Sequence, residues 1–112
     1  MIAVYGIPNC DTVKKARVWL DRAGLVYTFH DYKKEGADAE RLARWVSEKG
    51  ADVVLNKRGT TFRKLSDADR ARADSDPVGL MAEHSSLIKR PVVEYPGGLL
   101  VGFSDSEWAE KL

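Results

Sequence analysis

The chain has 112 residues, 31% of them charged and 44% hydrophobic, with a formal net charge of +1. This length predicts one domain, residues 1–112, and the near-zero charge argues against nucleic acid or an anionic membrane as a partner. One cysteine allows no internal disulfide, and one cysteine with two distant histidines, His30 and His84, excludes the four-cysteine and Cys/His patterns of structural zinc sites, so we expect no metal. No apolar stretch resembles a membrane span or a secretory leader, so we expect a cytoplasmic protein.

The N-terminal third predicts a strand, a tight turn, a helix and a second strand. Residues 2–5 form a short apolar, β-prone run that stops at Gly6. From Asp11 onward apolar residues recur at helical spacing, and Gly24 supplies a stop. These apolar positions are Val13, Ala16, Leu20 and Ala23. Residues 26–31 alternate like a strand, and a β-α-β unit of this size predicts a parallel pair.

The middle of the chain is predicted to be helical. After the polar residues 33–36, a helix ending at Gly50 should carry its apolar residues on one stripe. The stripe consists of Ala39, Leu42, Ala43 and Val46. Ser66 and Asp76 are typical N-caps of two further short helices, and Pro77 suits the first position of the second one.

The C-terminal part predicts a hairpin and a last helix. Residues 92–95 and 99–103 are apolar and β-prone, and the Pro-Gly-Gly at 96–98 between them is typical of a turn. Ser104 and Glu107 have the spacing of a capping box, which begins a helix. The predicted order is therefore β-α-β, helices, β-β-α.

Cys10 lies at the predicted turn from strand to helix. The free backbone amides of residues 11–13, at the positive end of the helix dipole, would stabilise its thiolate and lower the thiol pKa. Lys14, Lys15 and Arg17 could add positive potential. A free cysteine is often only a small buried apolar residue, but the Gly- and Pro-bounded turn favours an exposed, reactive thiol.

No second cysteine accompanies Cys10. Enzymes that reduce disulfides alone usually carry Cys-x-x-Cys, and the position of the second cysteine is Val13 here. An adduct on Cys10 must therefore be resolved by an outside thiol, and glutathione is the most abundant one in the cytosol. We expect glutathione as a co-substrate.

Three separated motifs carry a family resemblance. They are YGIPNCDTVKKAR at 5–17, NKRGTTFRKL at 56–65 and IKRP at 88–91. In this order they resemble the arsenate reductase-related (ArsC/Spx) family, most closely its YffB subgroup. The resemblance implies an α/β, thioredoxin-like fold with a mixed four-stranded sheet and a helical insertion at about residues 36–88.

The resemblance also implies roles for individual residues. In the family's arsenate reductases a cysteine attacks arsenate, three arginines hold the oxyanion, and glutathione with glutaredoxin releases the product. Cys10 matches the nucleophile, and Arg58 and Arg90 match two of the arginines. The third arginine is missing from residues 100–104, and Gly6 stands where a histidine is expected. Because each arginine is a strong, directional donor to an oxyanion, this departure disfavours arsenate as the substrate.

Pro91 is expected to follow a cis peptide bond, because the thioredoxin-like fold has a cis-proline facing its active cysteine. Such a bond would leave nearby backbone groups free to pair with an extended thiol such as glutathione. Asn9 and Thr12 flank Cys10 and complete the candidate binding residues, although Asn and Thr near a helix start are more often caps.

These observations favour an enzyme: a glutathione-dependent thiol reductase or transferase that acts on an unknown small-molecule or thiol substrate. We expect a monomer, with glutaredoxin as a candidate partner. One alternative is an arsenate reductase coupled to glutathione and glutaredoxin. Another is a Spx-like regulator that binds RNA polymerase, although the Spx switch implied by the resemblance uses Cys-x-x-Cys.

Overall fold

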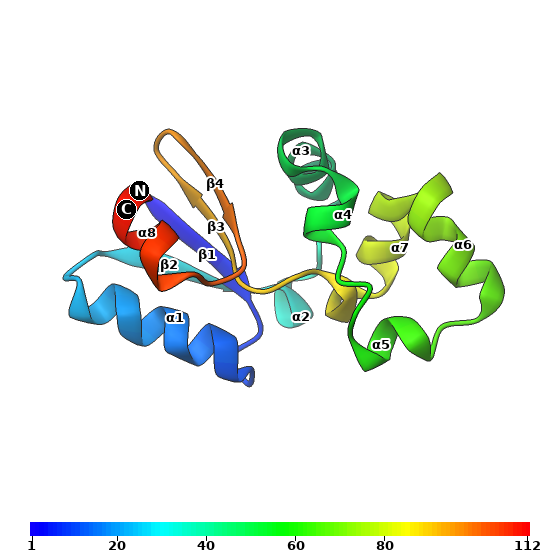
Figure 1. Ribbon diagram of the computed structural model, residues 1–112, viewed down its shortest axis with the longest axis horizontal. Helices are drawn as coiled ribbons and strands as arrows, with labels where there is room; N and C mark the ends of the chain where they lie inside the picture. The colour runs from blue at the N-terminus through cyan, green and yellow to red at the C-terminus, as the bar shows by residue number, and fades with distance from the viewer. The chain divides into compact units, whose positions relative to one another are not determined.

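Strand β1 (Ile2–Gly6) lies inside a four-stranded sheet of order β2-β1-β3-β4 in the computed structural model, which describes residues 1–112 (Figure 1). It pairs in parallel with β2 (Tyr27–Asp31) and antiparallel with β3 (Val92–Tyr95), which pairs antiparallel with β4 (Gly98–Val101). The expected α/β fold with a mixed four-stranded sheet is confirmed.

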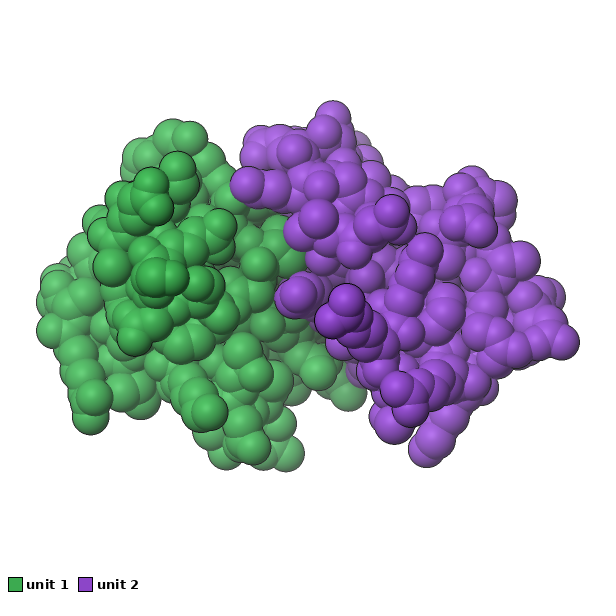
Figure 2. Space-filling view, in the orientation of Figure 1, with its two compact units in different colours: residues 1–35, 90–112 green, residues 36–89 purple.

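The chain divides into two compact units, drawn in green and purple in Figure 2. Residues 1–35 and 90–112 form the first, here called the sheet unit, and residues 36–89 form the second, the helical unit. The helical unit is thus inserted between the two halves of the sheet unit in the sequence. That all 112 residues fold as one domain stays a prediction. None of the helices has the length and apolar character of a membrane span.

Helices α1 (Asp11–Arg22) and α8 (Asp105–Lys111) cover one face of the sheet. The predicted apolar spacing of α1 is confirmed for Val13, Ala16 and Leu20, which are fully buried. It is wrong for Ala23, which is exposed and lies just past the end of the helix. The core of this unit consists of Val4, Ala16, Leu20, Val93, Leu100 and Trp108. Its strand members lie side by side on one face of the sheet, since Val4 pairs with Val93 and Val93 with Leu100.

Local capping chemistry explains where the predicted helices of the sheet unit begin and end. The Ser104 hydroxyl accepts a hydrogen bond from the Glu107 backbone N–H at 3.3 Å, as the capping-box spacing predicts. Gly24, just past α1, has φ = 71°, a conformation that favours glycine.

Val26 was predicted to begin β2, but it is 81% exposed and precedes the strand.

The helical unit contains α3 (Ala39–Lys49), α4 (Ala51–Val54), α5 (Thr60–Arg63), α6 (Asp67–Ser75), α7 (Pro77–Glu83) and the 3₁₀ turn η1 (Ser85–Leu87). The predicted caps are confirmed: Ser66 accepts from the Asp69 N–H, and Asp76 accepts from the Gly79 N–H, each at 3.1 Å.

Helix α3 packs against α7 through a stripe that differs from the predicted one. Leu42 and Trp45 are buried, whereas Ala39 and Ala43 are exposed and Val46 is only partly buried. An indole ring buries far more apolar surface than an alanine methyl group, so the helix turns Trp45 rather than Ala43 inward.

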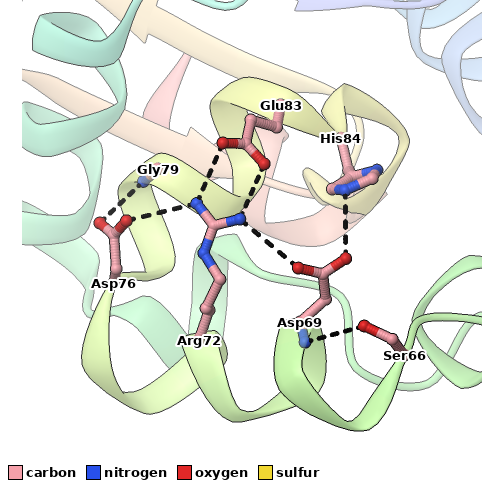
Figure 3. A network of polar contacts seen from close by, with 7 residues as sticks. All are labelled: Ser66, Asp69, Arg72, Asp76, Gly79, Glu83 and His84. Carbon is pink, nitrogen blue, oxygen red and sulfur yellow. Dashed lines mark hydrogen bonds and ion pairs between the residues drawn. The ribbon is translucent and has the colours of Figure 1, made fainter.

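A polar network joins α6 to α7 (Figure 3). The Arg72 guanidinium on α6 donates two hydrogen bonds to the Glu83 carboxylate on α7, at 2.7 and 3.3 Å, and a third to Asp76 at 3.4 Å. Asp69 lies 3.6 Å from Arg72 and 3.8 Å from the His84 ring nitrogen. Exposed ion pairs are weak singly, but a two-pronged arginine fork within a network is directional.

Replacement of Arg72 by Gln should lower the melting temperature of the protein by a few degrees at pH 7. The hydrogen bond and charge of Arg72 hold the pKa of Glu83 below its ordinary value. A carboxylate with a depressed pKa stabilises the fold above its unfolded pKa, and this contribution disappears as the pH falls through the folded pKa. The difference between wild type and Arg72→Gln, measured by thermal unfolding, should therefore shrink below about pH 4.

Arg44→Gln removes an exposed arginine from α3 and is the matched control, with no expected pH-dependent effect. An Arg72→Gln deficit that persists unchanged in acid would show that the network does not act through the Glu83 carboxylate.

Candidate active site around Cys10

Cys10 directly precedes α1 as its N-cap residue, with an extended backbone at φ = −132° and ψ = 127°. This conformation turns the side chain toward the first helical turn, where backbone N–H groups lack helical partners. The thiol makes no hydrogen bond of ordinary capping geometry, yet the N–H groups of Val13 and Thr12 act on its sulfur. The side chain is partly exposed, as a reactive thiol requires.

The surroundings of Cys10 favour the thiolate. Partial burial alone would raise the pKa of the thiol, but the Val13 N–H, the positive charge of Arg90, the Thr12 N–H and a hydrogen bond from Arg90 together bring that pKa below its ordinary value. The thiolate is the nucleophilic form of cysteine, so this position supplies more nucleophile at neutral pH than a free cysteine does.

The cation that acts on Cys10 is Arg90 rather than Arg17, one of the basic residues that follow the cysteine. Arg17 donates a hydrogen bond from Nε to the Tyr27 hydroxyl at 3.1 Å, and its guanidinium lies 4.2 Å from the centre of the Phe29 ring. A basic residue distant in the sequence therefore does what the nearby basic run was expected to do.

Sheet topology explains how Arg90 reaches Cys10. Strands β1 and β2 are parallel, so their carboxyl ends meet at one edge of the sheet, and the antiparallel β3 starts at the same edge. Cys10 follows β1 after a short turn, and Arg90 lies two residues before β3. Side chains that catalyse reactions commonly gather at such an edge.

Tyr32 is a member of this cluster that sequence reasoning missed. It follows β2 directly, as the first residue of α2 (Tyr32–Glu35), and is only 3% exposed. Burial raises the pKa of its hydroxyl strongly, and the charge and hydrogen bond of Arg90 oppose that shift only in part. Tyr32 therefore stays neutral and accepts a hydrogen bond from Arg90. The signal that could have found it is its place just after the second parallel strand.

The Arg90–Pro91 peptide bond is cis, as the resemblance implied. Pro91 is buried, and its carbonyl accepts a hydrogen bond from the Gly102 N–H at 2.8 Å. This carbonyl is therefore already paired within the sheet unit and is not one of the free backbone groups expected beside the proline.

Asn9 and Thr12 are both exposed, and neither side chain forms a hydrogen bond. Thr12 contributes to the site through its backbone N–H, which helps to lower the pKa of Cys10. Neither residue caps α1, because Cys10 itself occupies the N-cap position.

Arg58 belongs to the helical unit, where it lies exposed in the loop between α4 and α5. Its N–H donates to the Asn56 side chain at 3.1 Å, and its carbonyl accepts from the Arg63 guanidinium at 3.2 Å. These bonds hold the backbone of the loop and leave the Arg58 guanidinium without a partner. Arg58 lines an open hollow of about 560 Å³ together with Lys57 and Lys89.

The two departures from the family motif have structural counterparts. A Cβ atom at Gly6 would lie 3.0 Å from Cγ2 of the buried Val13, so a histidine here would require Val13 to move. In the stretch without arginine, Phe103 packs edge-on against Trp108, with ring centres 4.9 Å apart. No group of three or more His, Cys, Asp or Glu side chains is arranged to hold a metal ion.

Comparison with known proteins places these features in one family. Residues 5–111 match the ArsC family. The structure superposes on that of a protein named YffB with a TM-score of 0.94 and 50% identity, covering 98% of this chain and 97% of the other. An arsenate reductase-related protein from Brucella melitensis is 48% identical, with a TM-score of 0.77 and coverage of 97% and 92%.

The comparison also finds regulators. The global transcriptional regulator Spx of Streptococcus mutans is 27% identical over 110 residues, which are 96% of this chain and 80% of that protein. An uncharacterised protein of Haemophilus influenzae is 41% identical, with 96% of each chain covered.

Replacement of Arg90 by Gln should slow the alkylation of Cys10 by iodoacetamide at pH 7 by about three- to tenfold, because loss of the charge and hydrogen bond raises the thiol pKa and leaves less thiolate. The measurement is the second-order rate constant, followed by intact mass. Arg17→Gln is the matched control and should leave the rate within about twofold, since Arg17 is engaged by Tyr27 and Phe29. Equal slowing in both variants would contradict the assignment of Arg90.

Proposed function

The chain belongs to the ArsC family, an arsenate reductase-related family of thiol oxidoreductases, and on this basis we propose that it is a glutathione-dependent thiol reductase or transferase with Cys10 as its nucleophile. The observation that carries the proposal is a partly exposed thiol whose pKa is lowered by the start of α1 and by Arg90, with no second cysteine in the chain. We propose that it acts in the cytosol, where glutathione is the abundant thiol.

The proposed reaction is two successive thiol–disulfide exchanges. The Cys10 thiolate attacks one sulfur of a disulfide; a bond forms between Cys10 and that sulfur, the old S–S bond breaks, and the second sulfur leaves as a thiolate that takes a proton from water. A glutathione thiolate then attacks the sulfur bound to Cys10, and the Cys10 thiolate leaves. The net result is that the attacked half of the substrate disulfide becomes joined to glutathione, and the other half is released as a thiol. No other oxidant or reductant is consumed.

Arg90 has two proposed roles in this reaction. It stabilises the Cys10 thiolate before attack, and it stabilises the same thiolate again as the leaving group of the second exchange. Tyr32 is proposed to position Arg90, since its neutral hydroxyl accepts a hydrogen bond from the guanidinium. These roles depend on the positions of Cys10, Tyr32 and Arg90 at one edge of the sheet.

Arg58 is proposed to hold an anionic group of the substrate or of glutathione. Its guanidinium is unpartnered while its backbone is held on both sides, which suits a preformed anion site. Pro91, Asn9 and Thr12 are proposed to border the bound thiol, with Thr12 acting through its N–H.

Two alternatives have observations in their favour. The related protein from Brucella melitensis and the family motif favour arsenate reduction, but the chain offers only two of the three arginines. The Spx relatives favour a regulator that binds RNA polymerase, but Val13 replaces the second cysteine of the switch. Glutaredoxin is a candidate partner under either enzymatic reading.

Incubation of the wild-type protein with oxidised glutathione should add one glutathione to Cys10, and excess reduced glutathione should remove it. Intact mass spectrometry before and after each step measures both exchanges. Cys10→Ser keeps a small polar side chain at the N-cap position and should form no adduct while retaining the fold. Absence of an adduct on wild type would contradict the proposed chemistry.

Two further assays of the wild-type protein distinguish the proposed function from its alternatives. With glutathione and glutaredoxin, wild type should release arsenite slowly, because loss of one charged donor costs about 1.5 to 3 kcal/mol, roughly one to two orders of magnitude in rate. Rapid arsenite release would favour arsenate reduction over thiol reduction as the activity of this protein. Capture of purified RNA polymerase together with no glutathione adduct would favour the regulator.

A further inference from the structure

An open groove of about 600 Å³ runs along the exposed side of α1, beyond Cys10. Its apolar lining comes from Val18, Trp19, Ala23 and Phe103, and its basic lining from Lys14, Lys15 and Arg22. All seven residues belong to the sheet unit, and none of them acts on the thiol in the chemistry described above.

The apolar lining is held in place by contacts beneath it. The indole Nε1 of Trp19 donates to Asp105 at 2.7 Å, and the rings of Trp19 and Phe103 both lie edge-on to Trp108, with centres 5.6 and 4.9 Å away. Trp108 is fully buried and donates to the Gly102 carbonyl at 3.2 Å. A surface held in this way loses little side-chain freedom when a partner covers it.

The three cations of the groove are free to meet an anionic partner. None of the three forms an ion pair. Arg72 of the helical unit, by contrast, forms ion pairs with three carboxylates. One acid beside the lining, Asp105, accepts a hydrogen bond from the Trp19 N–H. Asp21, on the same helix, lines a different hollow with Arg17 and Tyr27. The groove therefore pairs an apolar centre with three cations that no acid holds in an ion pair.

The spacing of these cations matches that of a helix. Lys14 and Arg22 lie eight residues apart on α1, which is about 12 Å along the axis, with Val18 midway. A second helix that carries acids seven or eight residues apart, with apolar residues three or four positions from each, presents the same spacing. Such a helix would place its apolar stripe over Val18 and Trp19 and its acids beside the cations.

We propose that this groove is a docking site for an acidic, amphipathic helix of a partner protein. Electrostatic complementarity supplies the orientation and a faster encounter, and the apolar centre supplies the area. A lipid surface fits less well, because the aromatic rings lie in the lining of a hollow, packed on Trp108, and only three cations are present. The docking does not depend on thiol chemistry at Cys10.

The test uses the full chain and a fluorescein-labelled, capped, alanine-rich peptide of about 18 residues, with glutamates seven residues apart and leucines at the two positions midway. Fluorescence anisotropy measures its binding. We expect Lys15→Glu combined with Arg22→Glu to weaken binding at least about tenfold, and Val18→Ser to weaken it several-fold. Cys10→Ser should bind as wild type does.

The matched control is Lys34→Glu combined with Lys49→Glu, which changes the net charge equally at exposed positions that do not line the groove and should leave binding within about twofold. Failure of wild type to bind the acidic peptide would overturn the proposal. So would equal binding of a peptide with lysines in place of its glutamates, or equal weakening by the control. Binding to phosphatidylserine vesicles through Lys15 and Arg22, without peptide binding, would assign the surface to a membrane instead.

Discussion

Pairing of β1 with β2 in parallel and with β3 in antiparallel brings the ends of two strands and the start of a third to one edge of the sheet. The candidate site depends on this constraint. Cys10, Tyr32 and Arg90 are distant in the sequence, yet each is attached to one of these strand ends. The backbone thus brings the thiol, the start of α1 and a guanidinium together, and the thiol pKa falls as a result.

Features with local causes were predictable from the sequence. The caps at Ser66, Asp76 and Ser104 follow from hydrogen bonds within three residues, and the structure confirms each. Helices α2, α4 and α5 were not predicted, since four residues are too few for a helical period. The stripe of α3 was wrong in part because it depends on which side chain the rest of the core accepts.

The same division applies to the site. Activation of Cys10 by the first turn of α1 is a local effect, and the sequence predicts it correctly. The identity of the cation is not local. Proximity along the chain indicated Lys14, Lys15 and Arg17, whereas the sheet brings Arg90 to the thiol. Tyr32 was not predicted as a site residue for the same reason, since only the sheet brings it to Arg90. The cis bond before Pro91 came from family resemblance, because sequence alone favours trans.

The central claim is that the folded protein holds Cys10 as a more acidic thiol than a free cysteine. Its most direct measurement is a pH titration of the thiolate's ultraviolet absorbance in the unmodified protein, with Cys10→Ser as the blank. We expect a midpoint below the value of about 8.5 for a free cysteine. A midpoint at or above that value would contradict the claim.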